Sequence, residues 1–282
     1  MDAFSDRPFG GNGCAVVHQA ADLDDQTCMA FVRETSLVEC TFTGPSKVAD
    51  LRVRYFLASR EIPFAGHPTI ATAAALQARG WVPGNRMTLE TGAGIIPVEF
   101  TADGITMVQI APQFGPQVAP QAVAAVVGVS ANDIIAPPQI VSTGLPVCIT
   151  VLRDIETLRR ATLDVGRLAE FCASQGFADT DMMEPFLVTL NGATAQGDTF
   201  ARLLLAPPSP PEDPFTGSAT GAMAAYLWHH GLIEKSTFIA EQGRGMGRPG
   251  QARVSRIGSA EAITGVALTG RAHVLMSGDL IL

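Results

Sequence analysis

The sequence has few charged residues and no long apolar run. Only 16% of its 282 residues are charged, 47% are hydrophobic, and the mean hydropathy is +0.23. A chain of this composition can bury a core, which excludes an intrinsically disordered protein. No stretch approaches the run of about 18 apolar residues that a membrane-spanning helix needs, so we expect no membrane partner.

Basic residues are scarce relative to acidic ones. The chain has 19 Lys and Arg against 27 Asp and Glu, a net charge of −8 and a pI near 5.1. The basic residues are scattered, whereas nucleic-acid phosphates require a basic face, so we expect no nucleic-acid partner. At about 150 residues per domain, the length favours about two domains.

Cysteine pairs typical of disulfide frameworks or metal sites are absent. The 5 cysteines are far apart in the sequence and form no CxxC motif, which favours reduced thiols. We interpret Cys14 and Cys40 as small core residues rather than nucleophiles. The first residues, MDAFSDRPFGG, lack the basic and apolar regions of a secretory signal, so we expect a cytoplasmic protein.

An internal repeat is the clearest feature that is present. Residues 61–82 (EIPFAGHPTIATAAALQARGWV) match residues 212–233 (EDPFTGSATGAMAAYLWHHGLI) at a constant offset of 151. The match continues without a gap to 94 and 245, with 13 identities in 34 positions. Chance matching of Ala and Gly explains the shared P-F-x-G-x-x-T poorly. Because the offset is about half of the chain, the repeat predicts two related halves.

Each copy of the repeat predicts a loop, a buried helix and a strand. P-F-x-G is typical of a tight loop, and the Ala-rich run after it ends at Gly80 or Gly231, as at a helix C-terminus. The run is apolar nearly all round, which predicts a central helix. Pro68 in the first turn and Ser218 as a cap suit the two helix starts. The segments MTLETGAG and FIAEQGRG then predict a strand that enters a glycine turn.

Strand patterns dominate the remaining sequence. Examples are LRVRYFL, ITMVQI, PVCITVL and EPFLVTL. Helical patterns fall at 24–35, about 120–127 and about 164–175. The segment 111–120, rich in Pro and Gln, is the expected crossover between the halves.

These patterns predict an α+β protein with two pseudo-symmetric domains. Each domain is expected to wrap a sheet around one central helix, with a cleft between the two. We place the first domain at 1–114 and the second at 115–271. A final strand at about 272–282 is expected to pack on the first domain.

Two helix starts that face one cleft would bind a small anion. The first N–H groups of a helix lack partners within the helix and attract negative charge. Gly66 and Gly217 would let a carboxylate approach these N–H groups closely. The alternative is that both glycines only let the chain turn into each helix.

Two polar residues differ between the copies. His67 aligns with Ser218, and Asp213 aligns with Ile62. We expect both His67 and Asp213 to be exposed at a helix mouth, where they could act on a substrate. The alternatives are a structural histidine and a turn-forming or helix-capping acid, and the residues alone leave both open.

Glu39 is a candidate general acid/base. It lies in SLVECTFTG, at the head of an apolar strand-like run, where a carboxylate loses hydration. Burial would raise its pKa toward that of a general acid/base. The alternative is an outward-facing glutamate on an edge strand. The position 151 residues later is Leu190, and a single base returns a proton on the same face, which favours isomerisation over racemisation.

Nucleotide, metal and hydrolase motifs are weak or missing. GRGMG at 243–247 lacks the GxGxxG spacing and a following helix. His229 and His230 are adjacent and diverge, which gives no metal-ligand geometry. There is no GxSxG motif.

Five segments resemble the PhzF family of phenazine biosynthesis. They are DAFSDRPFGGN (2–12), SLVECTF (36–42), EIPFAGHPTIAT (61–72), EDPFTGSATGA (212–222) and EQGRGMGRPG (241–250). The resemblance implies the diaminopimelate-epimerase-like fold, with two pseudo-symmetric domains that each wrap a curled, mostly antiparallel sheet around a central helix. It also implies a homodimer that uses no metal or organic cofactor. The strand residues that usually precede the DAF segment in the family are missing, since the sequence starts at Met1 and Asp2, so we expect either a short first strand or a misassigned start.

The resemblance also implies roles for particular residues. Glu39 matches the glutamate that shuttles a proton on a dihydro-hydroxyanthranilate in the best-known member. His67 and Asp213 would hold polar groups of the substrate and assist proton movement. Backbone N–H groups would bind the substrate carboxylate, at Gly66, Gly217 and Ser218. The cysteine pair of related epimerases and proline racemases is replaced here by Ala65 and Thr216, which disfavours two-thiol racemisation.

We therefore predict an isomerase. Glu39 would take a proton from one carbon and return it to another carbon of a small carboxylate-bearing substrate between the domains. One alternative is an amino-acid epimerase or racemase of the same fold, which needs a second base on the opposite face. Another is a non-catalytic protein that binds small carboxylates.

Overall fold

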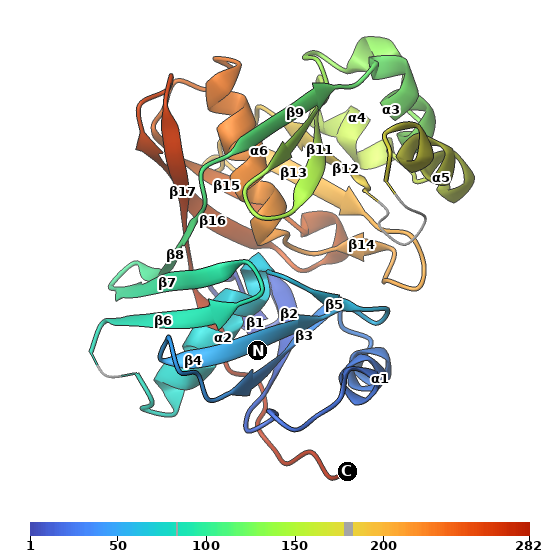
Figure 1. Cartoon of the computed structure of the whole chain (residues 1–282). Coiled ribbons are helices and arrows are strands. Elements are labelled where there is room, and N and C mark those ends of the chain that lie inside the picture. The colour runs from blue at the N-terminus through green and yellow to red at the C-terminus, as the bar shows by residue number, and fades with distance from the viewer. Residues whose placement is uncertain (83, 178–182) are drawn as a thin grey trace.

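Two similar halves, each built around one central helix, make up the molecule (Figure 1). The computed structural model describes residues 1–82, 84–177 and 183–282. The strands of each half curl around the helix, and most neighbouring strands are antiparallel. The predicted fold class is confirmed.

The first half contains the central helix α2 (Gly66–Ala78) and the outer helix α1 (Asp25–Thr35). Its strands β2 and β3 run parallel, as do β4 and β6. These strands are β1 (Asp2–Ala3), β2 (Asn12–Val17), β3 (Glu39–Gly44), β4 (Leu51–Phe56), β5 (Glu61–Ile62), β6 (Arg86–Thr91), β7 (Gly94–Thr101) and β8 (Gly104–Gln109).

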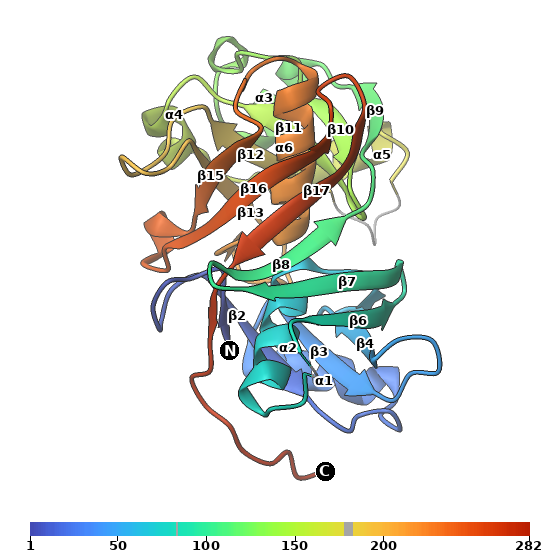
Figure 2. The same ribbon diagram turned by 90° about the vertical axis from the view of Figure 1, so that its left-hand side faces the viewer.

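The second half repeats this order around the central helix α6 (Gly217–His229), which stands behind β16 and β17 in Figure 2. Its strands are β10 (Gln139–Ser142), β11 (Pro146–Val151), β12 (Pro185–Thr189), β13 (Thr199–Leu204), β14 (Glu212–Asp213), β15 (Thr237–Gln242), β16 (Gly250–Gly258) and β17 (Ile263–Gly270). The smaller helices are α3 (Pro120–Val127), α4 (Ile155–Arg160), α5 (Val165–Ser174), η1 (Ala131–Asp133) and η2 (Arg244–Met246).

The internal repeat of the sequence is a repeat of the fold. The elements β5, α2 and β6 of the first half correspond to β14, α6 and β15 of the second, at the same offset of 151. The parallel pairs also correspond, because β11 and β12 pair as β2 and β3 do, and β13 and β15 pair as β4 and β6 do. The helices predicted at 24–35, 120–127 and 164–175 are present as α1, α3 and α5.

The halves exchange their last strands. β8 pairs with both β7 and β17, so the sheet is continuous between the halves. The expected crossover at 111–120 contains a further strand, β9 (Gln113–Gln117), which pairs with β10 of the second half. In the same way β18 (Ala272–His273) pairs with β1 of the first half. Only these two residues of the expected strand at 272–282 are in a strand, and 274–282 follow without regular structure.

The central helices are buried as predicted, but one detail of their starts is different. As the sequence indicates, each helix is followed by a glycine with positive φ, which is Gly80 at 71° after α2 and Gly231 at 63° after α6. Ser218 lies inside the first turn of α6 and is not its cap. The N-cap is Thr216, whose hydroxyl donates to Asp213 Oδ2 at 2.5 Å and so makes no cap hydrogen bond.

All five cysteines are buried and free of disulfides. Burial raises the pKa values of Cys14 and Cys40 above those of ordinary thiols, which fits small core residues rather than nucleophiles. No helix in the described part of the chain has the length and apolar character needed to cross a bilayer.

Candidate active site

The two central helices meet at their N-termini, through backbone rather than side chains. A Cβ added to Gly66 would lie 2.7 Å from Cα of Gly217, and one added to Gly217 would lie 3.0 Å from Cα of Gly66. Contacts this short would force the backbones apart. Both glycines therefore have a structural reason to be glycine, because they let the two halves touch at this point.

A cavity of about 430 Å³ lies beside this junction and is lined by both halves. Its walls are largely apolar, with Leu57 and Ile62 from the first half and Val147 and Leu203 from the second. Its polar lining residues are Glu39, Ser59, Arg60, Glu184, Ser209, Asp213, Thr216 and Ser218. Of the predicted site residues, Glu39, Asp213 and Ser218 therefore face one cavity. His67, Gly66 and Gly217 are not among its lining residues.

Glu39 is the first residue of β3, which lies between β2 and β4. The alternative of an edge-strand glutamate is therefore wrong. Its side chain is 15% exposed, and the exposed part faces the cavity. Burial, and then the nearby charge of Asp213, hold the pKa of Glu39 well above its usual value.

The second half has no glutamate at the equivalent strand position. β3 begins its parallel pairing with β2 at Glu39 and Cys14, and β12 begins its pairing with β11 at Pro185 and Cys148. By strand position the counterpart of Glu39 is therefore Pro185 rather than Leu190, because the connections before the two strands differ in length. Neither residue can exchange a proton.

Asn12 links the predicted residues across the two halves. Its amide nitrogen Nδ2 lies 2.9 Å from His67 Nδ1, 2.5 Å from Asp213 Oδ1 and 2.9 Å from the carbonyl oxygen of Phe215. An amide nitrogen donates hydrogen bonds and does not accept them. Asn12 therefore fixes the carboxylate of the second half and the imidazole of the first in one arrangement.

His67 is buried, so the expectation of an exposed histidine at the helix mouth is wrong. Only 2% of the residue is exposed, and burial lowers the pKa of His67 from 6.5 to about 3. The ring is neutral; its Nδ1 lies within hydrogen-bond distance of Asn12 Nδ2, and its buried Nε2 has no hydrogen-bond partner among the described residues. Nδ1 also lies 3.5 Å from Glu39 Oε2. A neutral ring beside Glu39 supplies no positive charge that would stabilise its ionised form.

Asp213 is also buried, at 3% exposure, so the expectation of an exposed acid is wrong as well. Burial raises the pKa of Asp213 to about 6, against the opposing hydrogen bonds from Thr216 and Asn12. Gln242 holds this turn by donating from Nε2 to the Asp213 carbonyl at 2.7 Å and by accepting from Thr216 N–H at 3.0 Å. The other half covers both helix mouths, which the sequence of one half does not reveal.

The start of α6 reaches the cavity, although the two helix starts pack against each other. The N-cap residues Ala65 and Thr216 make no cap hydrogen bond with their side chains. Ser218 and Ala219, in the first turn of α6, line the cavity. The positive end of this helix dipole therefore lies at the cavity wall. Arg60 also lines the cavity and adds a formal positive charge.

Sequence reasoning missed three residues of the site. Asn12 lies in the DAFSDRPFGGN segment, but nothing in the sequence shows that it contacts residues 55 and 201 positions away. Gln242 ends the repeat-derived strand β15. Glu184 lines the cavity from the second half, accepts from Ala206 N–H at 3.0 Å, and has its pKa raised by burial. Its position just before an apolar strand is the signal that could have found it.

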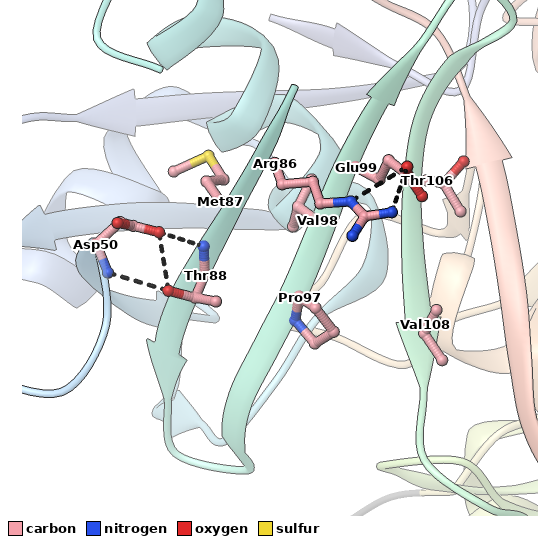
Figure 3. A pocket seen from close by; sticks show the side chains of 9 residues that line it. All are labelled: Asp50, Arg86, Met87, Thr88, Pro97, Val98, Glu99, Thr106 and Val108. Atoms are coloured by element: carbon pink, nitrogen blue, oxygen red, sulfur yellow. Dashed lines mark hydrogen bonds and ion pairs between the residues drawn. The ribbon is translucent and has the colours of Figure 1, made fainter. Parts of the chain in front are cut away.

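Another hollow, of about 310 Å³, lies on β6, β7 and β8 and contains none of the predicted residues (Figure 3). Its charged groups are occupied by neighbours, since Arg86 pairs with Glu99 at 3.1 Å and Asp50 accepts from Thr88. Across residues 1–82, 84–177 and 183–282, no three His, Cys, Asp or Glu side chains gather to hold a metal ion. The cavity between the halves is therefore the candidate active site.

The family model for phenazine biosynthesis-like proteins, PhzC-PhzF, matches residues 1–278. The chain belongs to this family. It is similar to an uncharacterized isomerase, YfhB, of Bacillus subtilis, with 32% identity over 262 residues that cover 90% of this chain and 88% of the relative. It is also similar to a trans-2,3-dihydro-3-hydroxyanthranilate isomerase of Pseudomonas fluorescens, with 30% identity over 290 residues and coverage of 100% and 98%.

A solved structure supports the same assignment. The PhzF-family phenazine biosynthesis protein of Bacillus anthracis superimposes with a TM-score of 0.83 and 25% identity, covering 96% of this chain and 93% of the other. The predicted family is confirmed, and the chain is an enzyme of the isomerase class.

Proposed function

We propose that this PhzF-family isomerase moves a proton between two carbons of a small carboxylate-bearing substrate, with Glu39 as the proton carrier. The observation that carries the proposal is the placement of Glu39. Glu39 forms a largely buried cluster with His67 and Asp213. The Glu39 side chain is 15% exposed and faces the cavity between the halves.

The surroundings of Glu39 suit a group that acts as a base and then as an acid. In its ionised form Glu39 removes a proton from one carbon, and the electron pair of the C–H bond moves into the adjacent unsaturated system. His67 is neutral, so it supplies no positive charge that would lower the pKa of the neighbouring Glu39. The resulting Glu39 carboxylic acid then protonates a second carbon of the same substrate, which restores the ionised Glu39. The raised pKa of Glu39 suits a carboxyl group that serves first as base and then as acid.

The substrate carboxylate is proposed to bind at the helix starts. The first turn of α6 reaches the cavity wall at Ser218 and Ala219, and neither central helix has a side-chain cap. N–H groups at such a helix start favour a negative charge. Asp213 stands on the same wall and would hold a polar group of the substrate near Glu39.

The test is proton NMR in D₂O with trans-2,3-dihydro-3-hydroxyanthranilate, the compound in the names of curated relatives. We expect conversion with deuterium at the newly protonated carbon. Glu39→Gln, which keeps the shape and removes the titrating group, is expected to fold and to lose nearly all conversion. The matched control is Glu99→Gln, at an exposed glutamate that pairs with Arg86 on the sheet surface.

Two outcomes would contradict parts of this proposal. Conversion by Glu39→Gln above about a tenth of the unaltered rate would remove Glu39 from the mechanism. If the unaltered protein leaves this compound unchanged, the compound is not its substrate. Deuterium exchange into other small carboxylic acids, lost in Glu39→Gln, would then identify the substrate class.

A second candidate is epimerisation with two bases, and Glu184 is the observation that favours it. Glu184 lines the same cavity as Glu39, from the other half, and its pKa is raised by burial. Two-base epimerisation would exchange hydrogen at a single α-carbon and would fail in Glu184→Gln as well as in Glu39→Gln. Carbon-to-carbon transfer by one base requires only Glu39.

We also propose a homodimer in the cytoplasm. The family resemblance implies the dimer, and five free, buried thiols suit a reducing compartment. Light scattering after gel filtration would show twice the chain mass of 29.6 kDa. A single-chain mass across micromolar concentrations would contradict the dimer.

A further inference from the structure

The cavity between the halves has an acidic residue at each end of an apolar wall. β13 pairs with β14 on one side and with β12 on the other (Figure 1), and the register puts Asp213, Leu203 and Phe186 in one row across the three strands. Continuing the pairing of β12 and β13 by two residues places Glu184 opposite Leu205. Residues in one row, and residues two apart along a strand, lie on the same face of a sheet. The two acids therefore share a face with the two leucines, and all four residues line the cavity.

The same register gives the separation of the two acids. Asp213 and Glu184 are two strand spacings apart, or about 10 Å, and two residues apart along the strands, or about 7 Å. Their backbones are therefore about 12 Å apart, so their carboxyl groups contact opposite ends of a small ligand rather than one atom of it. The wall between them is formed by Leu203 and Leu205. A ligand that spans this wall needs a polar group at each end and an apolar middle.

Glu184 occupies its end of the wall without a positively charged partner. Its hydrogen bond to another described residue is the one that Oε1 accepts from Ala206 N–H, at 3.0 Å. Across the described part of the chain, no Lys or Arg forms an ion pair with Glu184. Burial raises the pKa of Glu184, because an ionised carboxyl group among apolar residues loses its hydration. A cation brought by a ligand would stabilise the ionised form.

The charges along the cavity favour the same kind of ligand. Its described lining residues include three acids, Glu39, Asp213 and Glu184, and one base, Arg60, which lies in the connection between β4 and β5. The start of α6, four residues after Asp213, is the proposed place of the substrate carboxylate. A second negative group on the substrate would be repelled by Glu184, whereas a positive group would be attracted to it.

We propose that Glu184 selects substrates that carry an amine at the end opposite to their carboxylate. The inference rests on the proposed function for the place of the carboxylate and adds the recognition of the far end. The protonated amine donates a hydrogen bond to the carboxylate of Glu184, and the apolar middle of the substrate packs on Leu203 and Leu205. The substrate class is therefore small carboxylic acids with a distal amine, rather than dicarboxylic acids.

Calorimetric titration of the whole chain with three probes tests this proposal. The probes are 6-aminohexanoate, hexanoate and hexanedioate, which share a chain length and differ in the group at the far end. We expect 6-aminohexanoate to bind at least about tenfold more tightly than the other two, as for a charge-assisted hydrogen bond in a buried site. Glu184→Gln can still accept from Ala206 N–H, and it is expected to reduce this preference to about twofold or less. The matched control, Glu99→Gln on the sheet surface, is expected to keep it.

Failure of this proposal is distinguishable from failure of the proposed function. Binding of the probes needs no turnover, so Glu39→Gln is expected to keep the preference for the amine although it loses isotope exchange. Tighter binding of hexanedioate would overturn the proposal and would indicate that Arg60 holds the far group instead. Equal binding of the three probes, or no binding of 6-aminohexanoate, would overturn it as well. So would an unchanged preference in a well-folded Glu184→Gln protein, which would leave Glu184 only its hydrogen bond with Ala206 N–H.

Discussion

The halves of the molecule use one scaffold for different tasks. In the first half, the strand beside β2 begins with Glu39, and the central helix α2 contributes His67. In the second, the strand beside β11 begins with Pro185, and strand β14, which precedes α6, contributes Asp213. Both halves supply a helix start without a side-chain cap. In the proposed mechanism, the duplicated helix starts bind the anion, and the divergent residues supply the acid/base chemistry.

The junction of the halves is where a small change is expected to have the largest effect on stability. Gly66→Ala places a Cβ 2.7 Å from the backbone of Gly217 and forces the helix starts apart. We expect a loss of stability of about 3 kcal/mol and an activity loss of at least about a hundredfold. Urea unfolding and turnover assays measure both. The matched control is Gly245→Ala, since nothing lies within 4 Å of a Cβ there; equal effects of the two substitutions would contradict the close junction.

Asn12 is the next position to test, because its amide nitrogen contacts His67 of the first half and Asp213 of the second. Asn12→Ala removes the donor to Asp213 Oδ1, while Thr216 still donates to Oδ2, and it takes away the amide beside His67 Nδ1. We expect about 2 kcal/mol of destabilisation and roughly a thirtyfold fall in kcat, since buried polar groups lose their hydrogen bonds. Asn191→Ala, at an exposed position, serves as control. An Asn12→Ala protein with unchanged kcat would show that the bridge between the halves is not needed for catalysis.

His67 and Asp213 are expected to matter less than Glu39, because they support the reacting group rather than carry the proton. We predict that His67→Ala and Asp213→Asn each lower kcat/KM by about ten- to a hundredfold. Glu39→Gln is expected to lower it by about a thousandfold or more. Steady-state kinetics of the three variants under one set of conditions gives the order. A larger loss for either supporting residue would reverse the roles proposed here.

The smallest expected effect is on the pH dependence of stability, to which His67 of the first half and Asp213 of the second contribute with opposite sign. The folded pKa of His67, about 3, is below its ordinary value of 6.5, so its contribution is present above pH 6.5 and is lost as pH falls toward 3. The folded pKa of Asp213, about 6, is above its ordinary value of 3.8, so its contribution is present below pH 3.8 and is lost as pH rises through 6.

Removing the two groups should therefore change the pH dependence of the unfolding free energy in opposite directions. Between pH 4 and 6.5, His67→Gln is expected to reduce the loss of unfolding free energy on acidification by about 1 kcal/mol or more. Asp213→Asn is expected to make that loss steeper, because it removes a group that gains stability on acidification. Urea unfolding at a series of pH values measures both slopes. Parallel curves for the two variants would contradict the assigned burial of these groups.

The repeat made the fold predictable, but it did not predict the burial of the residues at the two helix starts. The offset of 151 located both central helices, the strands beside them and the glycines at their ends. It could not show that each helix start is covered by the opposite half, so His67 and Asp213 were expected at the surface. Burial there depends on a contact between residues far apart in sequence, at Gly66 and Gly217.

Non-repeated residues of the site were the hardest to predict. Asn12 and Glu184 have no counterpart with a similar role in the other half, and each acts through tertiary contacts. Glu39 was found because a carboxylate among Val38 and Cys40 is unusual in an apolar strand. Local pattern therefore identifies a polar residue that is out of place, whereas it does not identify the partners that the fold brings to it.

The comparison of Glu39 with Glu184 tests the central claim most directly. Both carboxyl groups line the cavity, one from each half, and both have pKa values raised by burial. The measurement is the rate of carbon–hydrogen exchange in D₂O for Glu39→Gln and Glu184→Gln, with a substrate that the unaltered protein turns over. We predict a loss of about a thousandfold for Glu39→Gln and retention of at least about a tenth of the rate for Glu184→Gln. Equal, severe losses in both variants would contradict a single proton carrier and establish two-base chemistry.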